Sequence, residues 1–141
     1  MKISITYYSE TGNTENLARS LETALLNAGA EVYIAPVNET DVNEFLQGDI
    51  LVFASPACGT EEVNDSDMLP FIENLGDKLQ QRDIFLCGTF GWGDGEYLQA
   101  WSEKMQELGC REVHQPYACL ESPDADAEEE LAELAEDLLK S

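Results

Sequence analysis

Positive charge is scarce in this sequence. Its 141 residues include seven Lys and Arg against 29 Asp and Glu, a formal net charge of −22 at pH 7. Nucleic acid is therefore a poor partner, because phosphate backbones are repelled by such a surface. The hydrophobic fraction of 43% is ordinary for a folded protein, so the charge belongs to the surface and does not indicate disorder. Basic protein partners are expected instead, with encounter rates that depend on ionic strength.

Histidine and closely spaced cysteines are also nearly absent. The single histidine, His114, has no second metal ligand near it in the sequence, so a structural or surface role is expected. The four cysteines, Cys58, Cys87, Cys110 and Cys119, form no Cys-x-x-Cys pair. Free thiols in a reducing compartment are the expected state of these side chains.

Long apolar runs are missing as well. The chain begins Met-Lys-Ile-Ser-Ile, with one charge and a short apolar run that does not resemble a secretory signal, and no stretch approaches transmembrane length. We therefore expect a cytoplasmic protein. Its length fits one domain spanning residues 1–141, and a monomer is the simplest expectation for its oligomeric state.

What the sequence does contain is a regular alternation of short apolar runs and amphipathic stretches, typical of parallel strands with crossover helices. Strands are predicted at residues 2–8, 31–35, 50–54, 84–88 and 113–120, the last interrupted or bent by Pro116. Helices are predicted over residues 15–28, 41–46 and 125–140, and a third helix from the apolar residues Met68, Phe71, Ile72 and Leu75. The fourth helix is predicted from a further stripe, whose residues are expected to lie in the core: Leu98, Trp101, Met105 and Leu108.

These five units predict an α/β fold, a three-layer α/β/α sandwich around a five-stranded parallel sheet in the order 2-1-3-4-5. In that order the first and third strands are neighbours. Their chains leave in opposite directions, which opens a crevice at the carboxyl ends of the strands.

The loop after the first strand, Ser9-Glu10-Thr11-Gly12-Asn13-Thr14, is a candidate anion cradle. Gly12 can take a positive φ without steric cost, so backbone N–H groups can point inward, and the following helix adds its positive dipole end. The loop has no Lys or Arg, so dipoles and hydrogen bonds would neutralise a phosphate here. For this stretch alone, an ordinary turn in which Asn13 or Thr14 caps a helix is the alternative.

Two further loops are predicted to meet this cradle at the same crevice. They are Ser55-Pro56-Ala57-Cys58-Gly59-Thr60-Glu61-Glu62 and Thr89-Phe90-Gly91-Trp92-Gly93-Asp94-Gly95, after the third and fourth strands. A dipole-lined cradle, a polar turn and a glycine-mounted Trp92 are together what a flat aromatic phosphate ester requires.

From residue 3 to about residue 139 the sequence resembles the short-chain flavodoxins. Thr11-Gly12-Asn13-Thr14 is similar to the family's phosphate-binding signature, Ala57-Cys58-Gly59-Thr60-Glu61 to its flavin-side turn, and Phe90-Gly91-Trp92-Gly93-Asp94-Gly95 to its aromatic loop. The resemblance implies non-covalently bound FMN and a low-potential one-electron carrier that shuttles electrons between redox proteins. It implies an electron-transfer protein rather than an enzyme.

The resemblance also implies roles for individual residues. Trp92 would cover one face of the isoalloxazine ring, Glu61 would accept a hydrogen bond from flavin N3, and the Gly59-Thr60 backbone would meet N5. Cys58 and Phe90 depart from the family pattern, in which methionine and tyrosine are common. The full set of implied FMN-binding residues is Ser9, Glu10, Thr11, Gly12, Asn13, Thr14, Ser55, Pro56, Ala57, Cys58, Gly59, Thr60, Glu61, Thr89, Phe90, Gly91, Trp92 and Gly93.

The acidic surface gives a physical reason for a reducing couple. Apolar walls and carboxylates disfavour the negative charge that a flavin gains on full reduction. Acidic residues near the second and third loops, Asp65, Asp67 and Glu96 among them, would also ring the exposed flavin edge and favour partners with basic faces.

Two other functions stay open from the residues. One is an FMN-dependent reductase of small molecules such as quinones, which would need a substrate pocket in the space that Trp92 is expected to occupy. The other is a flavin-free binding module, or a partner that activates one enzyme such as a ribonucleotide reductase with its metallocofactor. A colourless protein that does not take up FMN would favour the second.

Overall fold

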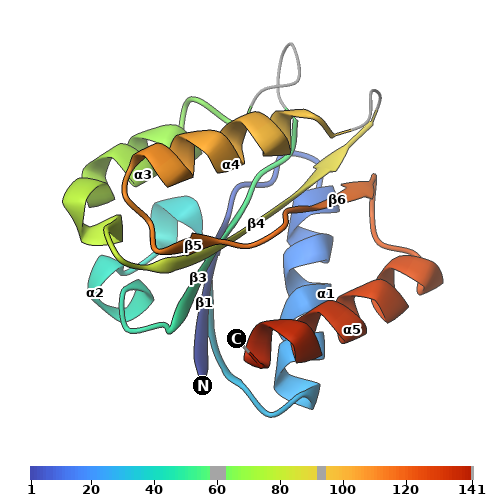
Figure 1. Cartoon of the computed structure of the whole chain (residues 1–141). Helices are drawn as coiled ribbons and strands as arrows, with labels where there is room; N and C mark the ends of the chain where they lie inside the picture. Colours follow the sequence, from blue (N-terminus) through green and yellow to red (C-terminus); the bar gives the residue numbers. More distant parts are fainter. Residues whose placement is uncertain (58–62, 92–94, 141) are drawn as a thin grey trace.

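The computed structural model describes residues 1–57, 63–91 and 95–140. Strands and helices alternate along the chain (Figure 1). The strands are β1 (Lys2–Tyr7), β2 (Glu31–Pro36), β3 (Ile50–Ala54), β4 (Asp83–Phe90), β5 (Glu112–Val113) and β6 (Tyr117–Leu120). The helices are α1 (Asn13–Asn27), α2 (Val42–Phe45), α3 (Met68–Leu75), α4 (Tyr97–Glu107) and α5 (Ala125–Leu139), with 3-10 turns η1 (Val37–Glu39) and η2 (Gly76–Leu79).

All strand pairs of the sheet are parallel, and the order β2-β1-β3-β4-β5 confirms the predicted topology. The fifth position is divided between two short strands. β5 pairs with Asp83 and Ile84 at the start of β4, whereas β6 pairs with residues 87–90 at its end. The break falls around Pro116, where the sequence predicts an interruption.

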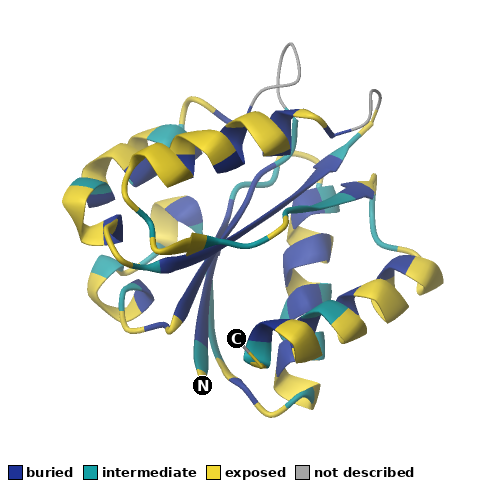
Figure 2. Cartoon of the chain, in the orientation of Figure 1, coloured by how far each residue is buried: buried dark blue, intermediate teal, exposed yellow. Residues whose placement is uncertain are grey.

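Two helical layers cover the sheet because its central strands are apolar on both faces. Along β3, Leu51 and Phe53 point into one core, whereas Ile50, Val52 and Ala54 point into the other. The first core is covered by α3 and α4, and the second by α1 and α5, which lie on the opposite side of the sheet (Figures 1 and 2).

One predicted core position is wrong. Leu108 is 38% exposed, although Leu98, Trp101 and Met105 of the same stripe are buried. α4 ends at Glu107, and Gly109 follows with φ 91°, so the chain turns away before Leu108 can complete the stripe.

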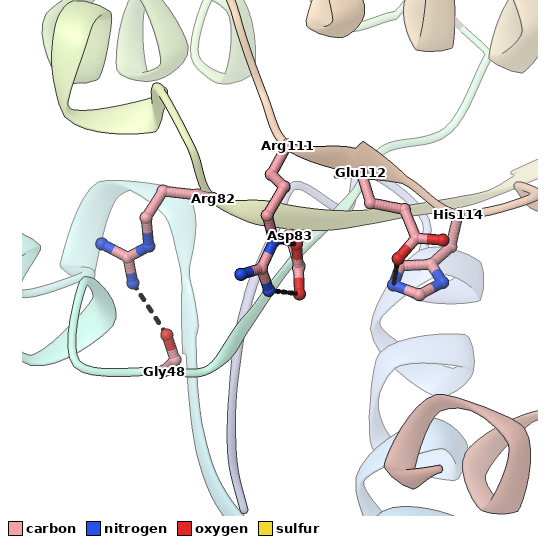
Figure 3. Close-up of polar contacts among 6 residues, drawn as sticks. All are labelled: Gly48, Arg82, Asp83, Arg111, Glu112 and His114. Atoms are coloured by element: carbon pink, nitrogen blue, oxygen red, sulfur yellow. Dashed lines mark hydrogen bonds and ion pairs between the residues drawn. The ribbon is translucent and has the colours of Figure 1, made fainter. Parts of the chain in front are cut away.

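The amino end of β4 carries a compact polar cluster (Figure 3). The guanidinium of Arg82 donates to the backbone carbonyls of Leu46 and Gly48, the latter at 2.7 Å. Arg111 holds the Asp83 carboxylate through two parallel hydrogen bonds, with Nε to Oδ1 at 2.7 Å. These contacts join the chain before β3 and the chain before β5 to the same end of β4.

No helix within the described residues has the length and apolar character needed to cross a membrane. Cys87, Cys110 and Cys119 are free thiols, as expected, and Cys58 lies outside the described residues. Burial raises the pKa of the Cys87 thiol to about 12, with a smaller effect of Cys119. Cys87 is therefore an unreactive core group.

Candidate functional site

The loop between β1 and α1 is shaped around Gly12 and Ser9. Gly12 is the N-cap of α1, with φ 96° in the left-handed region. Ser9 Oγ accepts hydrogen bonds from the backbone N–H of Gly12 at 3.1 Å and of Glu15 at 3.2 Å. Asn13 and Thr14 both lie inside the helix. The alternative in which one of them caps α1 is therefore wrong.

Space for an anion lies beside this loop. A Cβ atom added to Gly12 would meet no described atom within 4 Å. The N–H groups of the first turn of α1 and the positive end of its dipole lie at the same place. Ser9 Oγ accepts two of these backbone donors, and the N-cap residue Gly12 has no side chain to occupy the rest of the cradle, which fits a terminal phosphate group.

Two carboxylates near the cradle are held by tyrosine hydroxyls. Tyr7 donates to Glu15 Oε2 at 2.8 Å, and Tyr8 donates to Glu10 Oε1 at 3.1 Å. Burial, and then Glu15, raise the pKa of Tyr7 above its ordinary value, so its hydroxyl stays a donor at neutral pH. These contacts give the two acidic side chains defined partners next to the expected anion site.

A pair of buried threonines connects the first loop to the third. Thr14 Oγ1 and Thr89 Oγ1 are 2.6 Å apart, and both side chains are buried. The Thr14 hydroxyl is thus engaged with Thr89, 75 residues away in the sequence. The carbonyl of Thr89 also accepts the N–H of Ala57 at 2.9 Å, so this one residue contacts all three loops.

Tyr97, the first residue of α4, ties the second loop to the end of β4. Its hydroxyl donates to the carbonyl of Ser55 at 2.7 Å in a buried position. The close approach requires Gly88, because a Cβ atom there would overlap both the Tyr97 hydroxyl and the Ser55 carbonyl oxygen. Glycine at position 88 therefore permits the second and third loops to lie against each other.

Asn64 anchors the far end of the second loop. Its backbone N–H donates to Ser55 Oγ at 3.0 Å, and its side-chain oxygen accepts from the N–H groups of Asp67 and Met68 at 2.9 and 2.8 Å. Asn64 is 3% exposed. It therefore satisfies donors at the start of α3 and, through Ser55, brings together the chain on both sides of residues 58–62.

The chain after β6 closes the other side of the cradle. Ser122 donates to Asn13 Oδ1 at 2.7 Å and accepts from the Asn16 side chain at 3.1 Å. Phe90 accepts a backbone hydrogen bond from Glu121 at 2.9 Å. The end of β4, where the third loop begins, and the start of α1 are thus both attached to the turn that precedes α5.

Among the sequence-predicted site residues, those that the structure describes lie on three adjoining loops or on the elements beside them, Asn13 and Thr14 at the start of α1 and Thr89 and Phe90 at the end of β4. They are Ser9, Glu10, Thr11, Gly12, Asn13, Thr14, Ser55, Pro56, Ala57, Thr89, Phe90 and Gly91. Cys58, Gly59, Thr60, Glu61, Trp92 and Gly93 lie outside the described residues.

The sequence analysis missed four residues that support these loops, namely Tyr7, Asn64, Tyr97 and Ser122. Only Asn64 carries a recognisable signal, because an Asn followed by Asp and Ser just before an apolar helix is a typical helix start. The partners of Tyr7, Tyr97 and Ser122 depend on how strands and loops meet in space.

The fold defines a doubly wound α/β protein in which the chain changes direction between β1 and β3, the place where proteins of this architecture bind ligands. The flavodoxin family model matches residues 5–134. The chain belongs to the flavodoxin family.

Two named flavodoxins match the sequence of this chain along most of their length. The flavodoxin of Megasphaera elsdenii is 37% identical over 107 residues, which cover 76% of this chain and 78% of that protein. The flavodoxin of Clostridium beijerinckii is 34% identical over 129 residues, covering 92% and 93%. The solution structure of two-electron reduced M. elsdenii flavodoxin superimposes with a TM-score of 0.84 at 36% identity and covers 96% of this chain and 98% of that one.

Family membership settles the class of function. The protein is an electron carrier whose cofactor is FMN, and its partners are redox proteins. It is an electron-transfer protein rather than an enzyme, so the quinone reductase and the flavin-free partner protein are set aside. FMN supplies the one-electron chemistry when it is bound, and the chain supplies the cradle and the loop positions.

Proposed function

We propose that FMN is held by the three loops at residues 9–14, 55–61 and 89–93, with its phosphate in the Gly12 cradle and its ring between the second and third loops. The observation that carries this assignment is the buried contact network of Thr89, which reaches Thr14 on one side and Ala57 on the other. We also propose that residues 1–141 act as one cytoplasmic, monomeric domain. Three free thiols support the reducing compartment.

We further propose a low-potential couple. The three FMN-binding loops contain acidic side chains but no Lys or Arg. Negative charge added to a flavin in this setting has no cationic partner in the loops, and neighbouring carboxylates disfavour it. The remaining charge of the molecule acts in the same direction, although salt screens it over about 8 Å at physiological ionic strength.

The experiment compares two glycines that flank α1 and share their backbone geometry but lie at opposite ends of the helix. Gly12 precedes the helix with φ 96° and Gly29 follows it with φ 98°, and an added Cβ meets nothing within 4 Å at either. Gly12→Ala and Gly29→Ala therefore impose similar backbone strain, of about 1–2 kcal/mol. Affinities for FMN and riboflavin are measured by titration of the apoprotein with each flavin.

We expect wild-type protein and Gly29→Ala to bind FMN much more tightly than riboflavin. Gly12→Ala should lose most of that preference because the backbone donors no longer converge on the phosphate. Equal affinity of the wild-type protein for the two flavins would refute the phosphate role of the loop. An unchanged preference in Gly12→Ala would place the phosphate elsewhere.

The redox partners are proposed to present basic faces to the rim of the site. Asp65 and Asp67 lie beside the second loop, and Glu96 beside the third; Asp65 and Glu96 are exposed. Electron transfer to the cationic probe cytochrome c should slow as ionic strength rises. Asp65→Asn should flatten that dependence more than Glu136→Gln, which removes the same charge from α5. A flat or rising salt profile in the wild-type protein would count against this docking face.

A further inference from the structure

A cavity of about 370 Å³ lies between α5 and the break in the fifth strand position. Residues 114, 115 and 117, at the break, line it. The backbone N–H of His114 still pairs with Ile84 of β4, and β6 rejoins β4 only at Cys87. Phe85, between these two points, faces the core of α1 and α5 and lines the cavity. The volume falls in the range of small-molecule sites.

One part of the cavity lining is apolar. Phe85 and Leu138 are almost fully buried, at 1% and 4% exposed, and Leu134 packs against the same core. All three line the cavity. Leu134, the only one of the three that is partly buried, offers the apolar surface that an occupant would remove from water, which favours a ligand with an apolar body.

The other part of the lining is acidic. Glu130, Glu133 and Asp137 follow one another at helical spacing along α5, and all three line the cavity. Its described lining includes no Lys or Arg. Three carboxylates beside an apolar wall favour a positively charged group and disfavour an anion.

Polar groups of the strand break complete the lining. Tyr117 donates its hydroxyl to Glu130 at 3.2 Å, and burial, followed by the charge of Glu130, raises the pKa of Tyr117 above its ordinary value. The phenol therefore stays neutral, and its oxygen can accept a hydrogen bond from an ammonium group.

The imidazole of His114 also lines the cavity, and its Nε2 atom is buried without a hydrogen bond among the described residues. The closest acidic group to it is Glu112, whose Oε2 is 3.8 Å from Nε2, beyond hydrogen-bond range (Figure 3). Nε2 thus has a contact with Glu112 but no hydrogen bond among the described residues.

We propose that this cavity binds a small organic cation with an apolar body, of the arylalkylammonium class. The apolar part would lie on Phe85, Leu134 and Leu138, and the ammonium group would lie among Glu130, Glu133 and Asp137. The site is separate from the three FMN loops and would be present with FMN bound.

The test uses the FMN-loaded protein and three probes of similar shape: benzylammonium, neutral benzyl alcohol and anionic benzoate. Binding is followed by calorimetry and by chemical-shift changes in α5. We expect saturable one-to-one binding of benzylammonium, at least about tenfold tighter than benzyl alcohol, a margin of about 1.4 kcal/mol, and no binding of benzoate. Equal affinity for the ammonium and the alcohol would overturn the proposal.

Matched variants of α5 separate the site from the general negative field. Glu133→Gln removes a carboxylate from the lining, whereas Glu129→Gln and Glu136→Gln remove the same charge from positions of α5 that are equally classed as exposed but do not line the cavity. Glu133→Gln should weaken benzylammonium binding at least threefold, and the two controls should change it little. Equal losses in all three variants would show unspecific attraction and overturn the site. Tighter binding of tetralysine than of benzylammonium, with the same dependence on Glu133, would make it a protein-docking surface instead.

Discussion

At the scale of single residues, the second and third loops depend on close contacts that leave no room for a side chain at Gly88. Gly88→Ala would push a methyl group against the Tyr97 hydroxyl and the Ser55 carbonyl oxygen. We expect it to reduce the free energy of unfolding by about 1–3 kcal/mol and to weaken FMN binding, because the second and third loops must separate.

Gly91→Ala is the control for this change, since a Cβ atom at that position meets nothing within 4 Å. It lies in the same loop region but should leave stability nearly unchanged. Urea unfolding and FMN titration of both variants decide the matter. If Gly88→Ala is as stable as Gly91→Ala, the Tyr97 contact does not constrain the loops.

The threonine pair permits a sharper measurement at the same scale. Thr14→Val or Thr89→Val alone leaves one buried hydroxyl without its hydrogen-bond partner, which costs about 1–3 kcal/mol of stability. Replacing both threonines leaves no unpaired hydroxyl. The double variant should therefore be more stable than the sum of the single changes predicts. Additive losses in a double-mutant cycle of urea unfolding would mean that the two hydroxyls do not interact.

At the scale of elements, β4 is fastened at its amino end by a charge pair. The Arg111 guanidinium, bonded to both oxygens of Asp83, holds the pKa of this carboxyl below its ordinary value of 3.8. The ionised form is thus favoured in the folded state. Its contribution to stability is complete above pH 3.8 and disappears as the pH falls below that value toward the lower folded-state pKa.

Asp83→Asn should accordingly destabilise the protein most near pH 6 to 7, and the difference from wild type should shrink below pH 3.8. Unfolding by guanidinium chloride across this range measures it. Asp77→Asn, which changes an exposed carboxylate in η2, is the control and should show little difference at any pH. A difference for Asp83→Asn that does not change with pH would mean that packing, rather than charge, is lost.

Elements were the part of the structure that the sequence predicted best. β3 covers residues 50–54 as predicted. A short continuous apolar run bounded by polar residues is typical of a central strand, because such a strand is buried on both faces of the sheet. Pro116 correctly marked the break in the fifth strand position. The bounds of the strands were predicted less accurately. β4 extends from residue 83 to 90 rather than from 84 to 88, because its pairing with β6 continues beyond the apolar run.

The site was predictable only in part. A glycine before a helix and its hydroxyl-rich surroundings indicated a candidate cradle, since those features are local in the sequence. The contacts of Thr14 with Thr89 and of Tyr97 with Ser55 join residues 75 and 42 positions apart. Such partners follow from strand register and loop closure, so no local pattern indicates them.

At the scale of the whole molecule, the net charge of −22 opposes compactness. Salt screens the repulsion among surface carboxylates. The Tm should therefore rise, by on the order of 5 °C, between 10 and 300 mM NaCl, because each 1 kcal/mol gained raises the Tm of a domain of this size by roughly 2–8 °C. Calorimetry of the FMN-loaded protein measures this shift.

A KCl series should coincide with the NaCl series, because screening depends on ionic strength and not on the identity of the cation. A Tm that falls with salt would show that favourable pairs such as Asp83 and Arg111 outweigh the general repulsion. Divergence of the two series would instead indicate a specific cation effect.

The divided fifth position also affects aggregation. An edge strand exposes backbone groups that can pair with a second molecule, and long flat edges are the main route to such association. Here that edge consists of two residues of β5 and four of β6, with Pro116 between them. A proline and a change of position along β4 interrupt any intermolecular ladder after a few bonds. This protection is geometric, so it persists at high salt, where mutual repulsion between these acidic molecules no longer keeps them apart.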